Sequence, residues 1–192
     1  NDLRLFDIEC LKGIERVEIG NDCFKKVNEF VIDGLNDLKS MFIGRDSFKL
    51  DEYTSKRSKC LIMNCDQLSE IHIRNGSFLW YESLELKNLP SLISIQLDRS
   101  VFSCCYSIVF DSMNDWMIDE WDLTQLQSIT LGYLAIGGDA HKSNELIMKS
   151  MSDNDIDWWD LPSLSTFKGS GYNFCFTGKV ILESNDWWLN LN

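Results

Sequence analysis

Apolar residues recur along the chain in one frame that appears six times. The frame reads L-x-x-I-x-L-x-x-S-x-F at residues 92–102. Its other copies begin at Ile14, Leu38, Leu68, Leu126 and Leu164. Inside the frame two apolar positions are separated by a single variable residue, and this period of two places both apolar side chains on one face of a short β-strand. Helical neighbours lie three and four residues apart, so the spacing excludes a helical core.

A second pair of apolar residues with one residue between them precedes each frame, as at Phe30 and Ile32. The repeat length is 24 residues, for example from Leu11 to Leu35. Where the spacing is longer, polar insertions account for it, at residues 51–59, 114–122 and 152–160. One repeat alone cannot bury enough apolar surface to offset its conformational entropy, so repeats of this kind must stack. We therefore expect a mainly β solenoid of about seven coils, with two short strands per coil and little helix.

Length and charge narrow the possible functions. The chain has 192 residues, which we expect to form a single solenoid domain over residues 1–192. It starts at Asn1 without a signal-peptide pattern, so we expect a fragment of a longer protein. Its 18 basic and 30 acidic side chains give a net charge of 18 − 30 = −12. This charge argues against nucleic acid as a partner. No apolar run reaches the roughly 18 residues of a spanning helix, so no membrane insertion is expected.

The seven cysteines do not form a zinc pattern, because no C-x-x-C occurs and only two histidines are present. Cys60 and Cys65 fall at inward repeat positions, where cysteine serves as a small apolar filler. A disulfide involving Cys104 or Cys105 is the alternative. The compartment stays open between cytoplasm and cell surface, because unpaired thiols favour the first and a glycosylation acceptor at residues 75–77 favours the second.

The frame resembles the L-x-x-L-x-L-x-x-N-x-L signature of leucine-rich repeat proteins, with Phe at the last position. The spelling I-G-x-x-S-F at residues 43–48 is similar to the loose surface-antigen type of that family. The signature asparagine, which joins adjacent coils in a hydrogen-bond ladder in the family, is replaced here by Asp22, Asp46, Gly76, Ser100, Leu134 and Tyr172. Asp and, less well, Ser could accept part of that network. Leu134 and Tyr172 could not, which predicts a less regular C-terminal third. The resemblance implies a curved solenoid that binds partners and carries out no chemistry.

Two surfaces are candidates for such binding. The family uses its concave sheet, whose outward positions here are Glu18, Phe42, His72, Gln96, Thr130 and Lys168. The second-strand sheet should expose an apolar contact stripe at Val31, Leu61, Val109, Ile147 and Ile181, interrupted by Glu85. A contiguous apolar stripe is uncommon on a monomer. It indicates either a contact surface or a face covered by the Trp-bearing segments at residues 114–122, 152–160 and 185–188, which together hold six of the seven tryptophans.

These surfaces favour a non-enzymatic structural or protein-binding scaffold that is part of a larger assembly through the apolar stripe, with a protein partner or self-association. The alternative is a monomeric recognition module that binds a protein or glycan through the concave sheet. We expect no enzyme and no cofactor, since G-x-S-x-G, P-loop and H-E-x-x-H motifs are absent. We expect no metal either. The D-x-D-x-D run at residues 153–157 lacks the Gly and Glu of a calcium loop, so calcium remains a weak alternative.

Overall fold

The structure is a computed structural model that describes residues 3–111, 126–132, 135–136, 145–149, 166–169 and 179–183. These residues form two parallel sheets and no helix. Sheet A contains, in spatial order, β1 (Leu5–Asp7), β3 (Glu29–Asp33), β5 (Lys59–Met63), β7 (Ser83–Lys87), β9 (Ser107–Asp111), β11 (Glu145–Lys149) and β13 (Lys179–Glu183). Sheet B contains β2 (Arg16–Ile19), β4 (Ser40–Ile43), β6 (Glu70–Ile73), β8 (Ser94–Leu97), β10 (Ser128–Leu131) and β12 (Thr166–Gly169). The prediction of a mainly β chain with little helix is confirmed for this part of the chain.

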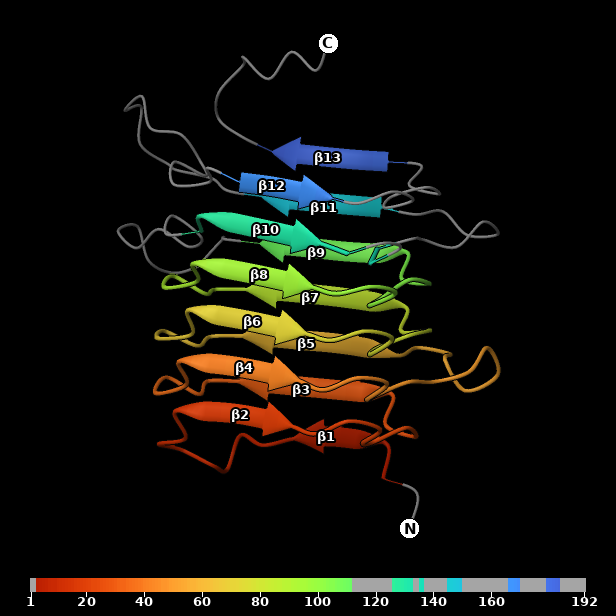
Figure 1. Cartoon of the computed structure of the whole chain (residues 1–192). Coiled ribbons are helices and arrows are strands. Elements are labelled where there is room, and N and C mark those ends of the chain that lie inside the picture. The colour runs from red at the N-terminus through yellow and green to blue at the C-terminus, as the bar shows by residue number, and fades with distance from the viewer. Residues whose placement is uncertain are drawn as a thin grey trace.

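The chain alternates between the two sheets, so that each strand pairs with the strand two places along the sequence (Figure 1). The register follows the apolar frame. Ile43 of β4 pairs with Ile73 of β6, and Ile73 pairs with Leu97 of β8. Residues 30 and 24 positions apart therefore occupy one column, as the period-two pattern predicts.

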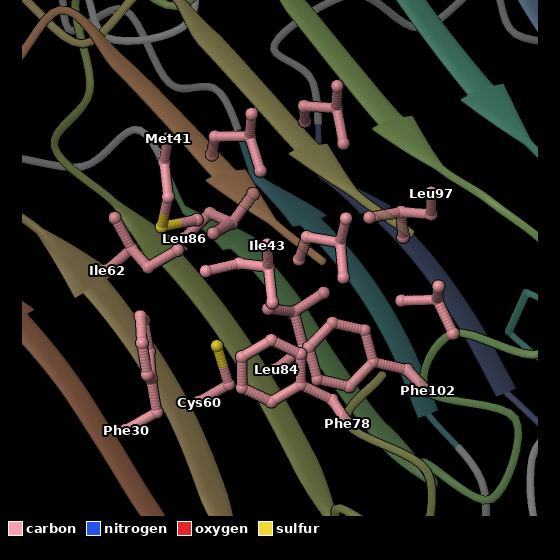
Figure 2. Close-up of a cluster of buried hydrophobic side chains, with 14 of the residues drawn as sticks. Phe30, Met41, Ile43, Cys60, Ile62, Phe78, Leu84, Leu86, Leu97 and Phe102 are labelled. Carbon is pink, nitrogen blue, oxygen red and sulfur yellow. The ribbon is translucent and has the colours of Figure 1, made fainter. Parts of the chain in front are cut away.

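The core lies between the sheets and consists of the apolar pairs of both strands. Phe30 and Ile32 of β3 are fully buried, as is Ile43 of β4. Figure 2 shows such side chains from successive strands meeting in one layer. Cys60 and Cys65 are also fully buried, which confirms the prediction that they fill inward positions.

A column of phenylalanine rings follows the last position of the frame. Phe48 stacks on Phe78 with ring centroids 4.9 Å apart and planes 5° from parallel, and Phe78 stacks on Phe102 at 4.9 Å and 14°. Phe24 extends the column at 5.2 Å from Phe48. All four residues have positive φ between 51° and 56°. A left-handed backbone costs an L-residue about 1–2 kcal/mol, and complete burial of the ring offsets this cost at Phe48, Phe78 and Phe102.

Where the structure describes it, the signature-asparagine position shows no inter-repeat ladder of the kind that Asp22 and Asp46 could accept in part. Asp46 is left-handed, with φ at 53°, and its carboxylate accepts a hydrogen bond from Lys49 instead. Gly76 occupies the same position with φ at 72°, and a Cβ there would lie 2.7 Å from Asp46 Oδ1. The residue that follows carries the ladder. Ser47 and Ser77 are fully buried, and their hydroxyls bond to the backbone of neighbouring repeats.

A second ladder runs along the opposite edge, just after the strands of sheet A. Asn88 Nδ2 donates to Asn64 Oδ1 at 2.7 Å, and Asn64 Nδ2 donates to Asp33 Oδ1 at 2.7 Å. Asn64 and Asn88 are both left-handed, with φ at 54° and 49°. Asparagine tolerates this conformation better than most residues. The sequence reading assigned these asparagines no role.

Several expectations fall outside the described residues. These are the insertions at 114–122 and 152–160, the D-x-D-x-D run at 153–157, and the ladder positions Leu134 and Tyr172. Within the part that is described, no helix is long and apolar enough to cross a membrane.

Candidate functional site

The outward face of sheet B carries the first candidate surface. The register aligns all six predicted positions in one column, from Glu18 on β2 to Lys168 on β12. Glu18 and Gln96 are exposed, whereas Phe42, His72 and Thr130 are half-buried by their neighbours on the same face. From Glu18 to Thr130 the column is therefore a continuous outward strip, and its side-chain contacts lie at Phe42, His72 and Gln96.

At this centre, side chains of β6 and of the segment ending β8 converge on the carboxylate of Asp98. Gln96 Nε2 donates to Asp98 Oδ1 at 3.0 Å, and His72 Nε2 lies 3.4 Å from the same oxygen. The guanidinium Nε of Arg74 is 3.9 Å from Oδ2. On the other side of His72, its ring meets the ring of Phe42 edge-on, with centroids 5.1 Å apart at 89°. We call these five residues the Asp98 cluster.

Backbone spacing explains why the cluster occurs in the middle of the sheet. Asp98 and Arg74 immediately follow the frame strand, at the position that Gly20, Gly44 and Gly132 occupy in other repeats. A Cβ on Gly132 would lie 2.5 Å from the backbone nitrogen of Arg99, and one on Gly44 would lie 2.5 Å from the carbonyl carbon of Gly20, so these two repeats leave no room for a side chain at this position. Only the frames that begin at Leu68 and Leu92 are followed by a bulky polar residue at this position, namely Arg74 and Asp98.

The sequence reading found Phe42, His72 and Gln96 but missed Arg74 and Asp98. The signal was present, because outward positions alternate and the two residues lie two places after His72 and Gln96 respectively. Both residues lie one place beyond the strands, which end at Ile73 and Leu97, so a prediction limited to strand positions does not include them.

The cluster combines an aromatic ring with hydrogen-bonding groups of both kinds. Asp98 and the amide oxygen of Gln96 accept hydrogen bonds, while Arg74 and the Gln96 amide nitrogen donate them. On this face of sheet B, two acidic side chains have basic neighbours. Arg16 pairs with Glu18 at 3.0 Å, and Arg74 lies near Asp98. Such a surface suits a neutral, hydroxyl- or amide-bearing ligand better than a strongly ionic one.

The outward face of sheet A carries the second candidate surface. Val31, Leu61, Glu85 and Val109 pair successively, and the register continues to Ile147 and Ile181. Val31, Leu61 and Val109 are half-buried, because strand neighbours cover part of each side chain. Glu85 interrupts the column and pairs with Lys87 at 2.7 Å. We keep the name apolar stripe for Val31, Leu61, Val109, Ile147 and Ile181.

Three of the described cysteines, Cys60, Cys65 and Cys105, offer little thiolate chemistry. Burial raises the pKa of the Cys105 thiol to about 12 and that of Cys65 to about 11, and it raises the pKa of Cys60 as well. A thiol must lose its proton to attack or to bind a metal, so these groups are inert at neutral pH. Within the described ranges, no three His, Cys, Asp or Glu side chains are grouped so that they could hold a metal ion.

Comparisons with other proteins add no relative: the chain matches no protein-family model, and neither curated proteins nor solved structures show significant similarity to it.

Proposed function

We propose that the chain is a leucine-rich-repeat-like solenoid of about seven coils that serves as a non-enzymatic scaffold. In this proposal it joins a larger assembly through the apolar stripe on sheet A, by contact with another copy or another protein. The two side-chain ladders and the alternation of strands between two parallel sheets support the repeat assignment. Repeat stacks present long regular surfaces, which suit binding better than chemistry.

The observation that carries the proposal is the apolar stripe itself. Its residues occupy the middle position of β3, β5, β9, β11 and β13, and the register aligns them in one column with Glu85 of β7 between Leu61 and Val109. Charged pairs border it, such as Lys59 with Glu29 at 3.4 Å. An apolar centre with a polar rim is the usual anatomy of a protein interface.

Sedimentation velocity over the micromolar range tests this proposal. Wild type should sediment as a dimer or larger species, whereas the double variant Leu61→Asp/Val109→Asp should be monomeric. The matched control is Ser40→Asp/Ser94→Asp, which places the same charges on half-buried outward positions of sheet B and should behave as wild type. A monomeric wild type whose stripe is labelled throughout by hydroxyl radicals would contradict the proposal.

The Asp98 cluster supports a second candidate function, a monomeric recognition module that binds a protein or glycan through sheet B. Aromatic rings beside planar hydrogen-bonding groups are well suited to ligands with alternating apolar and hydroxyl faces. The position of the cluster at the centre of the strip favours recognition there over recognition at the ends of the sheet.

Binding to an immobilised panel of neutral glycans and peptides tests this candidate. Phe42→Ala and Asp98→Asn should each abolish a binding event that Leu61→Asp/Val109→Asp leaves unchanged. Binding lost only in the sheet A variant would assign recognition to the apolar stripe instead.

A further inference from the structure

The loop that leads into β5 differs from the other described connections. It contains the insertion at residues 51–59 and projects from the side of the stack (Figure 1). Tyr53 in this loop is 87% exposed, more than any other large apolar or aromatic side chain in the described residues. The next most exposed is Leu3 at 53%. A ring this exposed contributes little to folding, so its presence invites a role in recognition or modification.

Of the hydroxyl groups in the run Asp51-Glu-Tyr-Thr-Ser55, only that of Tyr53 is available on the folded loop. Thr54 Oγ1 donates to Asp51 Oδ1 at 2.9 Å and accepts from the Asp51 N–H at 3.2 Å. Ser55 is 7% exposed, and its hydroxyl donates to the carbonyl of Glu52 at 3.1 Å. The phenol of Tyr53 makes no hydrogen bond or ring contact with another described residue.

The hydrogen bonds that close the turn around Tyr53 lie within the loop itself. The Asp51 carboxylate accepts the N–H groups of Tyr53 and Thr54 at 3.0 and 2.9 Å, which closes the turn locally. Contacts to the rest of the molecule lie outside the turn, at the Leu50 N–H to the Leu79 carbonyl and at the Arg57 N–H to Glu82 Oε2. Local opening of such a loop costs far less than unfolding a strand. An enzyme that needs an extended substrate segment can therefore gain access here.

We propose that Tyr53 is a phosphoryl acceptor for a tyrosine kinase with a basic substrate cleft. Tyr53 Oη attacks the γ-phosphorus of a nucleoside triphosphate. The Oη–P bond forms as the bond to the bridging oxygen breaks, the diphosphate leaves with the electron pair, and the phenolic proton passes to a base of the kinase. Asp51 and Glu52 place negative charge directly before the acceptor, which complements a basic cleft.

The modification changes the surface and leaves the fold intact. Phosphotyrosine adds a charge of about −1.5 to −2 at neutral pH. This charge appears at Tyr53, six residues before β5 begins, on a turn that contributes no residue to the apolar stripe or to the Asp98 cluster. The modification is therefore proposed separately from the scaffold function. It would create an acidic docking point for a partner that presents arginine side chains.

Labelling of the folded 192-residue chain tests the proposal. The enzyme is a soluble tyrosine-kinase domain that phosphorylates acidic copolymers of Glu and Tyr, with ATP as donor and peptide mass mapping as readout. Tyr53 should be labelled at least about a hundredfold faster than Tyr81, because Tyr81 is fully buried and reacts only after extensive opening. Tyr53→Phe should abolish the fast phase, and the melting temperature of the labelled protein should equal that of the unlabelled one.

A synthetic peptide of residues 48–60 provides the control for the enzyme. If the peptide is phosphorylated and the folded chain is not, the loop is closed to kinases and the proposal is wrong. Failure of both would show that the sequence is no kinase substrate, which overturns the proposal equally. Neither result affects the scaffold function, which sedimentation tests separately.

Discussion

The backbone N–H of Ser47 donates a hydrogen bond to the hydroxyl of Ser77 across 3.1 Å, although 30 residues separate them in the chain. The Ser77 hydroxyl in turn donates to the carbonyl of Gly44 at 2.6 Å. Ser47 repeats the arrangement one layer earlier, where it accepts the N–H of Cys23 and donates to the carbonyl of Gly20. Each buried hydroxyl thus pairs two backbone groups that the left-handed turn leaves without a strand partner.

Removal of one such hydroxyl should destabilise the protein. Ser77→Ala leaves the Ser47 N–H and the Gly44 carbonyl buried without this partner, so we expect a loss of about 1–3 kcal/mol in the free energy of unfolding. Urea denaturation followed by circular dichroism measures it. Ser94→Ala, at a half-buried outward position, is the control and should change the free energy by less than about 0.5 kcal/mol. Equal stability of the two variants would rule out a structural role for the serine ladder.

Two variants of Asn64 separate the contribution of backbone conformation to stability from that of the side-chain hydrogen bonds. Asn64→Ala loses the side-chain bonds and also forces alanine into a left-handed conformation, whereas Asn64→Gly loses only the bonds. We expect the alanine variant to be less stable than the glycine variant by about 1 kcal/mol. The same denaturation assay measures both, and the reverse order would contradict the assigned backbone conformation.

Truncation of a phenylalanine in the column should lower the free energy of unfolding more when its ring is more deeply buried. Phe78 is fully buried between Phe48 and Phe102, so Phe78→Ala should cost about 3–5 kcal/mol. Phe24 has the same ring contact on one side but is 38% exposed. Phe24→Ala should therefore cost clearly less. Similar losses in the two variants would contradict the layered packing of the rings.

Alkaline pH should destabilise the fold through its buried thiols. Burial raises the pKa of Cys105 from its ordinary value of 9.0 to about 12. The unfolded chain therefore releases this proton at lower pH than the folded chain, so the stabilisation is complete below about pH 9 and declines as the pH rises toward 12. The loss from this group approaches about 1.4 kcal/mol per pH unit.

A variant without the thiol isolates this effect from other titrating groups. The difference in unfolding free energy between wild type and Cys105→Ala should shrink as the pH rises from about 9 to 11, because only wild type carries the thiol. Urea denaturation at a series of pH values under reducing conditions measures the difference. Parallel profiles would mean that Cys105 is not buried in the folded state.

The columns of the fold could be predicted from the sequence because they depend on a single periodicity. A period of two decides which face Ile43 and Ile73 occupy, and the recurrence of the frame decides that they pair, although the insertion at residues 51–59 separates them by 30 residues. The ladders could not be assigned in this way. The signature predicts Asp46 as the ladder residue. In the structure, the positive φ of Asp46 and Phe48 turns the intervening Ser47 inward. A pattern of hydrophobic positions carries no information about φ, so it could not predict this turn.

The candidate site was predictable in part for a related reason. Alternation along the strand identifies Phe42, His72 and Gln96 as outward neighbours, and the register places them in one column. The convergence of His72 and Gln96 on Asp98 depends on side-chain conformations across two strands. The pattern of residues along the sequence does not determine these side-chain conformations, so it could not predict the contacts.

Distances between spin labels test most directly the claim that the repeats stack in sequence order. Labels introduced as unnatural amino acids leave the native cysteines unchanged. With one label at Arg16 on β2 and the second at Ser94, Ser128 or Thr166, the pairs span three, four and five strand spacings. Backbone separations should rise in equal steps, to about 14, 19 and 24 Å. Distances that fail to increase in this order would contradict the stacked arrangement on which both candidate surfaces depend.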